Sequence, residues 1–572
     1  MRHASRWLGS AAVTGMVLSI ALVPAGVQAQ SIGYEGVGDN GHDAGKSEPY
    51  RPGKSDRSSR RAGKSGKLVD VTPYIEIAQV VDAELSPGND VLTYTQMAAG
   101  LDATVAGRYN AASVSVRYEH QIGWGKKARN GDAVSGIARG YTTIVPGVTV
   151  EAGGIATQQS GGYRGSALGT GRVSDAGQTR IYSVYGGPSV ATRAGDVDLN
   201  ANYRAGFTKI DRSKSSVGNL DVFDKSTMHV ADVEAGVAPG TVLPVGVGVG
   251  GSFYQEDISN LDQRVRDMQA RAMVTVPVGR SVQAVAAIGY EDVEISARDA
   301  VRDSSGLPVV GSNGRYVTDK SSPRVLAYDV SGLTWDVAVM WRPSRRTSLS
   351  AHVGRRYGAT NYGGTLSYAP DDRSQLSIVV YNNIAGFGGL IDRPIEDLPG
   401  ALQAGPDPIN GDLNGCVDSL QGQNCFAGAL GSLRSSTFRA RGIAASYTVR
   451  IGRINAGLGM GYDQRRFIAP RGTVLASANG LVDKGYWLAG NLGGRLGQSA
   501  SWATNVYVNW LSSNDPLFSD VVGYGATASY SRLLADRLQG SLAIGIDGVR
   551  RDDSSLEDIV SASALAALRY NF

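Results

Sequence analysis

Residues that could do chemistry are few in this chain. Of its five histidines, His120, His229 and His352 lie far apart, each inside a segment of alternating polar and apolar residues. A hydrolase needs a histidine beside a serine or a carboxylate, and zinc proteases use a short spacing such as His-Glu-x-x-His, which the sequence lacks. We therefore predict no catalytic site, no metal site and no cofactor, and we expect that the chain is not an enzyme.

The two cysteines, Cys416 and Cys425, are separated by eight residues. A close pair of this kind in a secreted protein favours a local disulfide. Closing so short a loop contributes at most about 3 kcal/mol, so its main effect would be to fix the tip of a loop. A metal site is the alternative, although no histidine lies near the pair in the sequence.

The N-terminus indicates the compartment. Arg2 and Arg6 precede an apolar stretch from Leu8 to Val23, and small residues end at Ala29. This pattern predicts a cleavable secretory signal over 1–29. An anchoring helix is the alternative, but the apolar run is short and no cysteine follows it to carry a lipid.

Residues 30–69 are rich in Gly, Ser, Lys and Arg and poor in large apolar residues. Such a segment cannot bury enough surface to fold alone, which predicts a flexible basic periplasmic arm. Its repeated Gly-Lys-Ser is not a phosphate-binding loop, because Asn40, Glu48 and Ser58 stand where that motif needs its upstream glycine. Contact with an anionic polymer is an alternative role. The net charge of +4 gives no case for nucleic-acid binding.

The membrane class follows from hydropathy and glycine content. No later stretch has the roughly 18–20 apolar residues that a transmembrane helix needs, and the mean hydropathy is -0.14, which excludes a multi-helix membrane protein. Glycine accounts for 76 of 572 residues, well above the ordinary share of roughly 7%. Many of these glycines lie inside alternating segments, where they suit small positions facing a lumen or lipid.

From Asp70 onward the dominant pattern has a period of two. Between 197 and 209, Leu199, Tyr203 and Phe207 alternate with polar or small residues. The segments with this pattern are 71–85, 91–106, 112–125, 133–144, 148–158, 178–193, 197–209, 227–237, 242–255, 262–278, 281–296, 324–342, 346–356, 362–369, 374–383, 437–451, 454–468, 484–496, 500–512, 520–534, 538–550 and 559–572.

The connections between these segments alternate in length. Tight turns such as 145–147, 238–241 and 452–453 alternate with longer polar connections such as 297–323 and 384–436. Long loops on one rim and short turns on the other are typical of outer-membrane barrels and not of soluble sandwiches. The sequence therefore predicts an all-β fold over 70–572: a transmembrane antiparallel up-and-down β-barrel of about 22 strands, within a range of 20–24, with periplasmic N- and C-termini.

The end of the chain supports this interpretation. Leu568, Tyr570 and Phe572 alternate with polar or small residues and finish on a terminal aromatic ring. The pattern resembles the C-terminal β-signal of outer-membrane proteins. The resemblance implies recognition by the barrel assembly machinery, location in the cell outer membrane, and contact with outer-membrane lipid and lipopolysaccharide.

A second resemblance covers about 60 residues. Trp341-Arg342-Pro343-Ser344-Arg345-Arg346-Thr347-Ser348-Leu349, followed by Gly354-Arg355-Arg356-Tyr357, resembles a strand–turn–strand element of β-barrel porins. That group includes proteins associated with exopolysaccharide and surface-sorting gene clusters. The resemblance implies only the class, a porin-like barrel connected with exopolysaccharide.

Alternation also predicts which charged residues face the lumen. The predicted lumen and selectivity residues are Arg117, Glu119, Arg204, Arg271, Asp336, Arg356, Arg450 and Arg495. They could pair with one another structurally, or they could filter solutes, with the arginine excess favouring anions.

Barrels near 22 strands are usually plugged, and the long segment 384–436 with its cysteine pair is the candidate constriction. We expect a pore that passes or exports a hydrophilic solute, such as an exopolysaccharide. A plugless surface receptor or binding barrel is the alternative, and an outer-membrane hydrolase is a distant third.

Overall fold

The computed structural model describes residues 68–107, 109–125, 128, 130–160, 178–212, 224–389, 402–403, 416–419, 422–425, 436–516, 520–552 and 557–572. The predicted signal segment and nearly all of the predicted basic arm lie outside these residues. The first strand begins at Leu68, two residues before the predicted start of the barrel.

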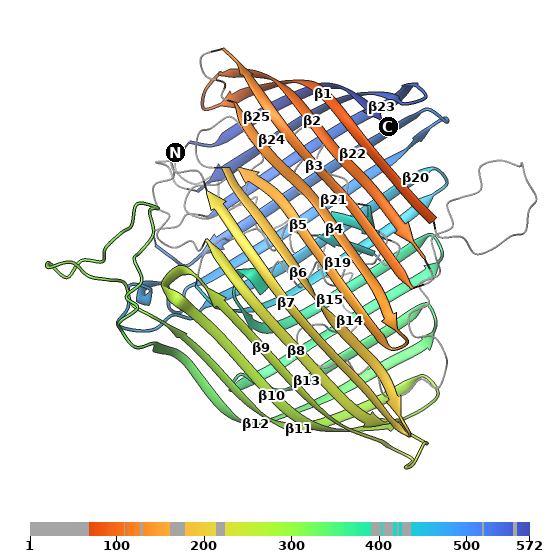
Figure 1. The fold of residues 1–572 in the computed structure, drawn as a ribbon, viewed down its shortest axis with the longest axis vertical. Helices are drawn as coiled ribbons and strands as arrows, with labels where there is room; N and C mark the ends of the chain where they lie inside the picture. The colour runs from red at the N-terminus through yellow and green to blue at the C-terminus, as the bar shows by residue number, and fades with distance from the viewer. Residues whose placement is uncertain are drawn as a thin grey trace, which may run out of the picture.

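One closed antiparallel barrel of 22 strands accounts for most of the described chain (Figure 1). Its strands are β1 (Leu68–Ser86), β2 (Val91–Ala106), β3 (Asn110–Trp124), β4 (Gly131–Val145), β5 (Val148–Ser160), β6 (Gln178–Ala194), β7 (Val197–Arg212), β8 (Lys225–Val237), β9 (Gly246–Ile258), β10 (Gln263–Pro277), β11 (Val282–Ala297), β12 (Val325–Ser344), β13 (Thr347–Arg356), β14 (Ala359–Asp371), β15 (Ser374–Ala385), β19 (Phe438–Ile451), β20 (Ile454–Phe467), β21 (Val482–Leu496), β22 (Ala500–Ser513), β23 (Val521–Ala535), β24 (Leu538–Arg551) and β25 (Ile559–Asn571). Each strand pairs with the next along the chain, and β1 pairs with β25 to close the wall. The prediction of an all-β barrel of about 22 strands is confirmed.

A small sheet lies within the long segment between β15 and β19. It consists of β16 (Leu402–Gln403), β17 (Cys416–Ser419) and β18 (Gly422–Cys425). The register of β17 and β18 places Cys416 directly opposite Cys425. Opposed residues of an antiparallel pair have Cα atoms about 4.5–5.5 Å apart, within the range that a disulfide bridges. The backbone therefore supports the disulfide, which stays a prediction.

Alternating residues of each strand lie on opposite faces of the wall, because successive side chains of a strand point to opposite sides. On β7, Tyr203 and Phe207 are exposed on the outer face, whereas Thr208 is fully buried on the inner face. Thr208 shares a hydrogen bond of 2.7 Å with Ser183 of the neighbouring strand β6. At this part of the wall the inner face is therefore polar and the outer face apolar.

The two rims differ as the sequence predicts, with one exception. The expected tight turn at 238–241 is instead an eight-residue connection from 238 to 245, and β9 begins at Gly246 rather than at 242. Pro244 has no backbone N–H and therefore cannot donate to the β8–β9 ladder. The strand consequently starts only after this proline.

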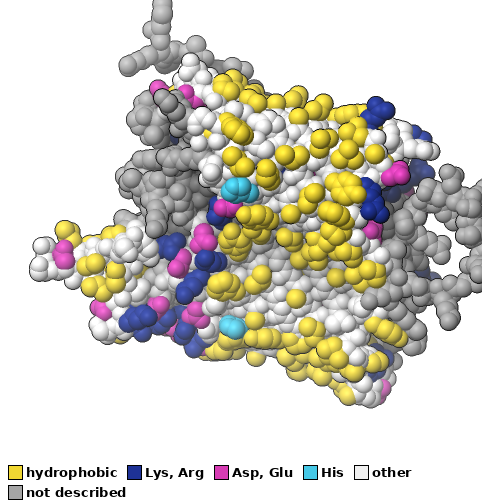
Figure 2. All heavy atoms as spheres, turned by 45° about the horizontal axis from the view of Figure 1, so that its top comes forward, with side chains coloured by type: hydrophobic (Ala, Val, Ile, Leu, Met, Phe, Trp, Pro, Cys, Tyr) yellow, Lys and Arg dark blue, Asp and Glu magenta, His cyan; other side chains and the backbone are white. Residues whose placement is uncertain are grey.

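The outer face carries an apolar belt with a charged border at the long-connection rim (Figure 2). In the belt, Val249, Ile288 and Leu542 are all more than half exposed. At the border on β9–β11, Arg264 pairs with Asp257 at 2.6 Å and Arg266 with Glu294 at 3.2 Å. The border marks the height at which the surrounding medium becomes polar.

The β13–β14 hairpin ends short of this rim. It turns at Tyr357 and Gly358, which both have left-handed backbones with φ of 56° and 63°. β13 pairs with β12 only from Trp335 onward, although β12 begins at Val325, and β14 pairs with β15 only as far as Val380. The wall therefore has a notch here, between the first residues of β12 and the last residues of β15.

Candidate functional site: the lumen wall and the extracellular mouth

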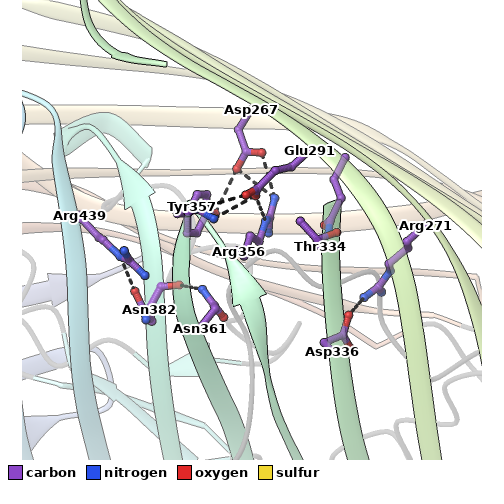
Figure 3. Close-up of polar contacts among 12 residues, drawn as sticks. Asp267, Arg271, Glu291, Thr334, Asp336, Arg356, Tyr357, Asn361, Asn382 and Arg439 are labelled. Carbon is purple, nitrogen blue, oxygen red and sulfur yellow. Dashed lines mark hydrogen bonds and ion pairs between the residues drawn. The ribbon is translucent and has the colours of Figure 1, made fainter. Parts of the chain in front are cut away.

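A buried charge cluster lies on the inner wall below the notch (Figure 3). Arg356 contacts Asp267 at 3.0 Å and Glu291 at 3.7 Å. The hydroxyl of Tyr357 donates to Asp267 at 3.1 Å, and its backbone N–H donates to Glu291 at 3.0 Å. The cluster thus ties the tip of the β13–β14 hairpin to β10 and β11.

Further pairs line the same sector. Arg271 lies 3.6 Å from Asp336, and a ring nitrogen of His352 lies 3.2 Å from the side-chain oxygen of Asn361. These residues border a cavity of about 30 Å³, which has room for a water molecule or two and not for a substrate. His352 lies on the inner face of β13, and its contact with Asn361 is a structural one.

Two other sectors of the lumen wall, at β1–β3 and at β5–β7, repeat this arrangement. Arg117 contacts Glu76 at 2.9 Å and Glu119 at 3.3 Å, and the Nε of Arg204 donates to Glu151 at 2.6 Å. Charges on the same strand or on strands two apart therefore satisfy one another, which favours wall stabilisation over solute filtering for these residues.

Two of the predicted selectivity residues differ from the others. Arg450 and Arg495 lie on the inner face near the short-turn rim, and both are exposed. Arg450 donates to Asn455 at 3.2 Å, and neither arginine has a carboxylate among its described contacts. The structure therefore separates the eight predicted residues into six that are tied into the wall and two at the periplasmic end.

Glu256 is the residue that sequence reasoning missed. It is fully buried on the inner face of β9, two residues before the strand ends. Its two carboxylate oxygens accept hydrogen bonds from the hydroxyls of Ser226 and Tyr254, at 2.7 and 2.6 Å, and from the N–H groups of Gly386 and Gly388, at 2.7 and 3.0 Å. Alternation along β9 places Tyr254 and Glu256 on one inner face, but no sequence signal indicates contact with a segment 130 residues away.

This contact carries the chain over one side of the mouth of the barrel. Gly386 follows β15 directly, whereas Glu256 lies on β9, and five strands separate these two around the wall. Phe387 is buried with 1% exposure. A Cβ atom at Gly386 would lie 2.6 Å from the Glu256 carboxylate and from the Ile258 side chain, so a larger residue there would displace these side chains. The described start of segment 386–437 therefore lies inside the mouth and not above it.

Three further connections pack together over the same sector. They are 259–262, 298–324 and 468–481, and their shared apolar cluster consists of Leu261, Ala297, Ala300, Ala469, Leu475 and Ala478. The N–H of Val474 donates to Asp299 at 2.9 Å. Burial raises the pKa of Asp299, but hydrogen bonds from Val474, Ala300 and Arg302 outweigh it, so this pKa lies below its ordinary value. We call these three connections, together with residues 386–389, the cap.

The closed barrel and its apolar outer belt decide the location of the chain. A closed barrel leaves no unpaired strand edge, and only such a barrel or a helix can span a bilayer. The protein is an outer-membrane β-barrel. No helix among the described residues is long and apolar enough to cross a bilayer. No group of three or more His, Cys, Asp or Glu residues in the described part could hold a metal ion.

Comparisons with known proteins give little beyond this. No family model matches the chain, and no curated protein sequence matches it. The FrpB iron transporter from Neisseria meningitidis is 11% identical, with 88% of this chain and 83% of that chain covered and a TM-score of 0.42. The ferric-catecholate import receptor Fiu from E. coli K12 is 9% identical, with 87% and 81% covered and a TM-score of 0.41.

Proposed function

We propose that the protein is an outer-membrane channel for a hydrophilic solute, narrowed at its extracellular mouth by the cap and by segment 386–437. The observation that carries this proposal is the combination of a polar, charged inner wall with packed loops across one side of the mouth. A barrel of this strand number is wide and needs an obstruction to keep large molecules out. The cap lies where such an obstruction would act.

The inner wall suits a solute rich in hydroxyl groups. On the sector away from the buried charge clusters, Asn491 of β21 lies directly opposite Asn505 of β22, and Asn455 lies on the inner face of β20. Amide side chains donate and accept hydrogen bonds with sugar hydroxyls. This supports a carbohydrate as the solute; the narrower proposal of exopolysaccharide rests on the resemblance of 341–357 to porins of that group.

Liposome swelling tests the channel directly. Proteoliposomes that contain the full chain should swell in isotonic solutions of small sugars, and the rate should fall as the sugar becomes larger. Protein-free liposomes provide the baseline. An absence of swelling above this baseline with every sugar, from correctly folded and heat-modifiable protein, would contradict the channel.

A surface receptor is the second candidate, and one observation favours it. Connection 298–324 is folded rather than irregular, with isolated bridges that pair Ala300 with Thr318 and Val310 with Tyr316. It projects beyond the rim in Figure 1, and Leu307 near its tip is 63% exposed. A rigid, exposed apolar tip is a feature of binding surfaces. A receptor would leave the liposomes silent while still binding its ligand.

A further inference from the structure

Three cations surround one glutamine on the outer face of β19–β21. Arg441 lies directly opposite Gln464 on one side and Lys484 lies directly opposite it on the other. Arg466 lies two residues beyond Gln464 on the same face. Since neighbouring strands are about 4.8 Å apart and alternate residues of a strand about 6.7 Å apart, all three side chains can reach one anion above Gln464.

These residues face the membrane environment and not the lumen. Ile443 on β19, Met460 on β20 and Tyr486 on β21 are exposed on the outer face. Arg441, Arg466 and Lys484 share that face because each is separated from these residues by an even number of positions. The strand ends beyond them lead to the long connections, so the cations lie at the extracellular border.

The cations are layered over aromatic and apolar rings. One step toward the short-turn rim, Tyr462 lies directly opposite Tyr486, with ring centroids 4.8 Å apart. One step further, Met460 lies opposite Leu488. Tyrosines mark the interfacial region of barrels, so this order passes from lipid headgroups at the cations to acyl chains at Met460 and Leu488. The Tyr462 hydroxyl donates to the Gln464 side-chain oxygen at 3.4 Å, which directs the amide nitrogen of Gln464 away from Tyr462.

The charge of this patch is not neutralised on its own strands. The acidic residues of β19–β21 are Asp463 and Asp483, and both are buried on the inner face, where Asp463 contacts Arg465 at 2.5 Å and Asp483 accepts from Ser513 at 2.6 Å. Arg264 and Arg266, at the corresponding border of β10, are instead paired with carboxylates on neighbouring strands. The border of β19–β21 is thus a candidate anion site, and the ion-paired border of β9–β11 is its matched control.

We propose that Arg441, Arg466 and Lys484, with the Gln464 amide, bind a phosphate group of a phosphorylated glycolipid of the outer leaflet. Arginine and lysine bind phosphate through charge-assisted hydrogen bonds, and the acyl chains of such a lipid would lie along Tyr486 and Leu488. The inference depends on the outer-membrane location and not on the channel. The two sectors differ in that the cations at β9–β11 are paired with carboxylates, whereas β19–β21 carry no acidic residue on their outer face.

The test measures lipopolysaccharide bound to the purified full-length protein. The triple variant Arg441→Gln, Arg466→Gln and Lys484→Gln should bind lipopolysaccharide at least tenfold more weakly than the wild type. The double variant Arg264→Gln and Arg266→Gln should bind as the wild type does. All proteins are first checked for heat-modifiable folding, and only folded protein is titrated.

Two further arms identify the source of the phosphate. Dephosphorylated lipopolysaccharide should bind the wild type about as weakly as intact lipopolysaccharide binds the triple variant. Inorganic phosphate at millimolar concentration should not compete. Equal binding by wild type and triple variant, equal binding of the dephosphorylated lipid, or efficient competition by free phosphate would each overturn the proposal.

Discussion

Replacing Glu256 by glutamine should loosen the cap. Both carboxylate oxygens of Glu256 accept two hydrogen bonds each, from Ser226 and Gly388 on one oxygen and from Tyr254 and Gly386 on the other. Glutamine replaces one of these oxygens by an NH₂ group. This group is itself a donor, so it cannot accept the two hydrogen bonds that the oxygen accepted. The substitution changes neither the size nor the position of the side chain, so its effect is on these contacts.

The magnitude follows from the lost bonds. Hydrogen bonds to a charged group contribute about 1.5–3 kcal/mol each, and two of the four lose their acceptor. The hydroxyl on Ser226 or Tyr254 can rotate and accept from the new NH₂ group, which recovers part of the loss, whereas a backbone N–H cannot. We expect a net cost of about 2–4 kcal/mol, which shifts the balance toward an opened cap by roughly 30- to 700-fold.

Planar-bilayer recordings test this prediction. Glu256→Gln should show larger or more frequent openings than the wild type, and cells that carry it should become sensitive to large antibiotics such as vancomycin. Thr208→Val is the control, because it breaks the inner-wall hydrogen bond to Ser183 without touching the cap. Unchanged conductance and sensitivity of an inserted Glu256→Gln barrel would refute the role of Glu256 as the anchor of segment 386–437.

Three further predictions concern assembly, orientation and pH. Deleting Phe572, whose ring packs edge-on against Tyr570 at 5.2 Å on the outer face, should leave the protein degraded in the periplasm; heat-modifiable, membrane-extracted protein would contradict the assembly signal. A cysteine at Ser312 should react with a membrane-impermeant reagent on intact cells and one at Ser344 should not, and the reverse result would invert the orientation. Hydrogen bonds from Ser321 and Ser322 lower the pKa of Asp319 to about 2. The ionised Asp319 therefore stabilises the fold of connection 298–324 fully above the ordinary pKa of 3.8, and this stabilisation is lost as pH falls toward 2. Amide protection factors in 298–324, each the intrinsic exchange rate divided by the observed rate at the same pH, should therefore be unchanged between pH 7 and 5 and lower near pH 2. A fall in these protection factors already at pH 5 would contradict this assignment.

The strands could be predicted from sequence because the two faces of each strand meet different surroundings. On β7, apolar Tyr203 and Phe207 face outward while Asn202 and Arg204 face the wet lumen, so a period of two appears directly in the residues. The two-residue turns were also predictable, since their glycines must adopt left-handed backbones, as at Gly452 with φ of 61°. Alternation alone does not predict the eight-residue connection at 238–245, because it takes no account of Pro244, which has no backbone N–H to donate to the strand ladder.

The mouth of the barrel could not be predicted in this way. The contact of Glu256 with Gly386 and Gly388, and that of Asp299 with Val474, join segments more than a hundred residues apart. Such contacts depend on the curvature of the wall and on which loops fold inward, and neither leaves a periodic pattern. Alternation similarly placed Arg271 and Arg356 on the inner wall, but their carboxylate partners Asp336 and Asp267 became identifiable only through the register of neighbouring strands.

Single-channel conductance of the wild type beside a variant that lacks 395–430 tests the central claim most directly. A channel narrowed at its mouth predicts small ohmic openings in the wild type and openings several-fold larger in the deletion, with both barrels inserted and heat-modifiable. Silence from both proteins, or equal conductance of the two, would contradict a channel whose opening is set by this segment.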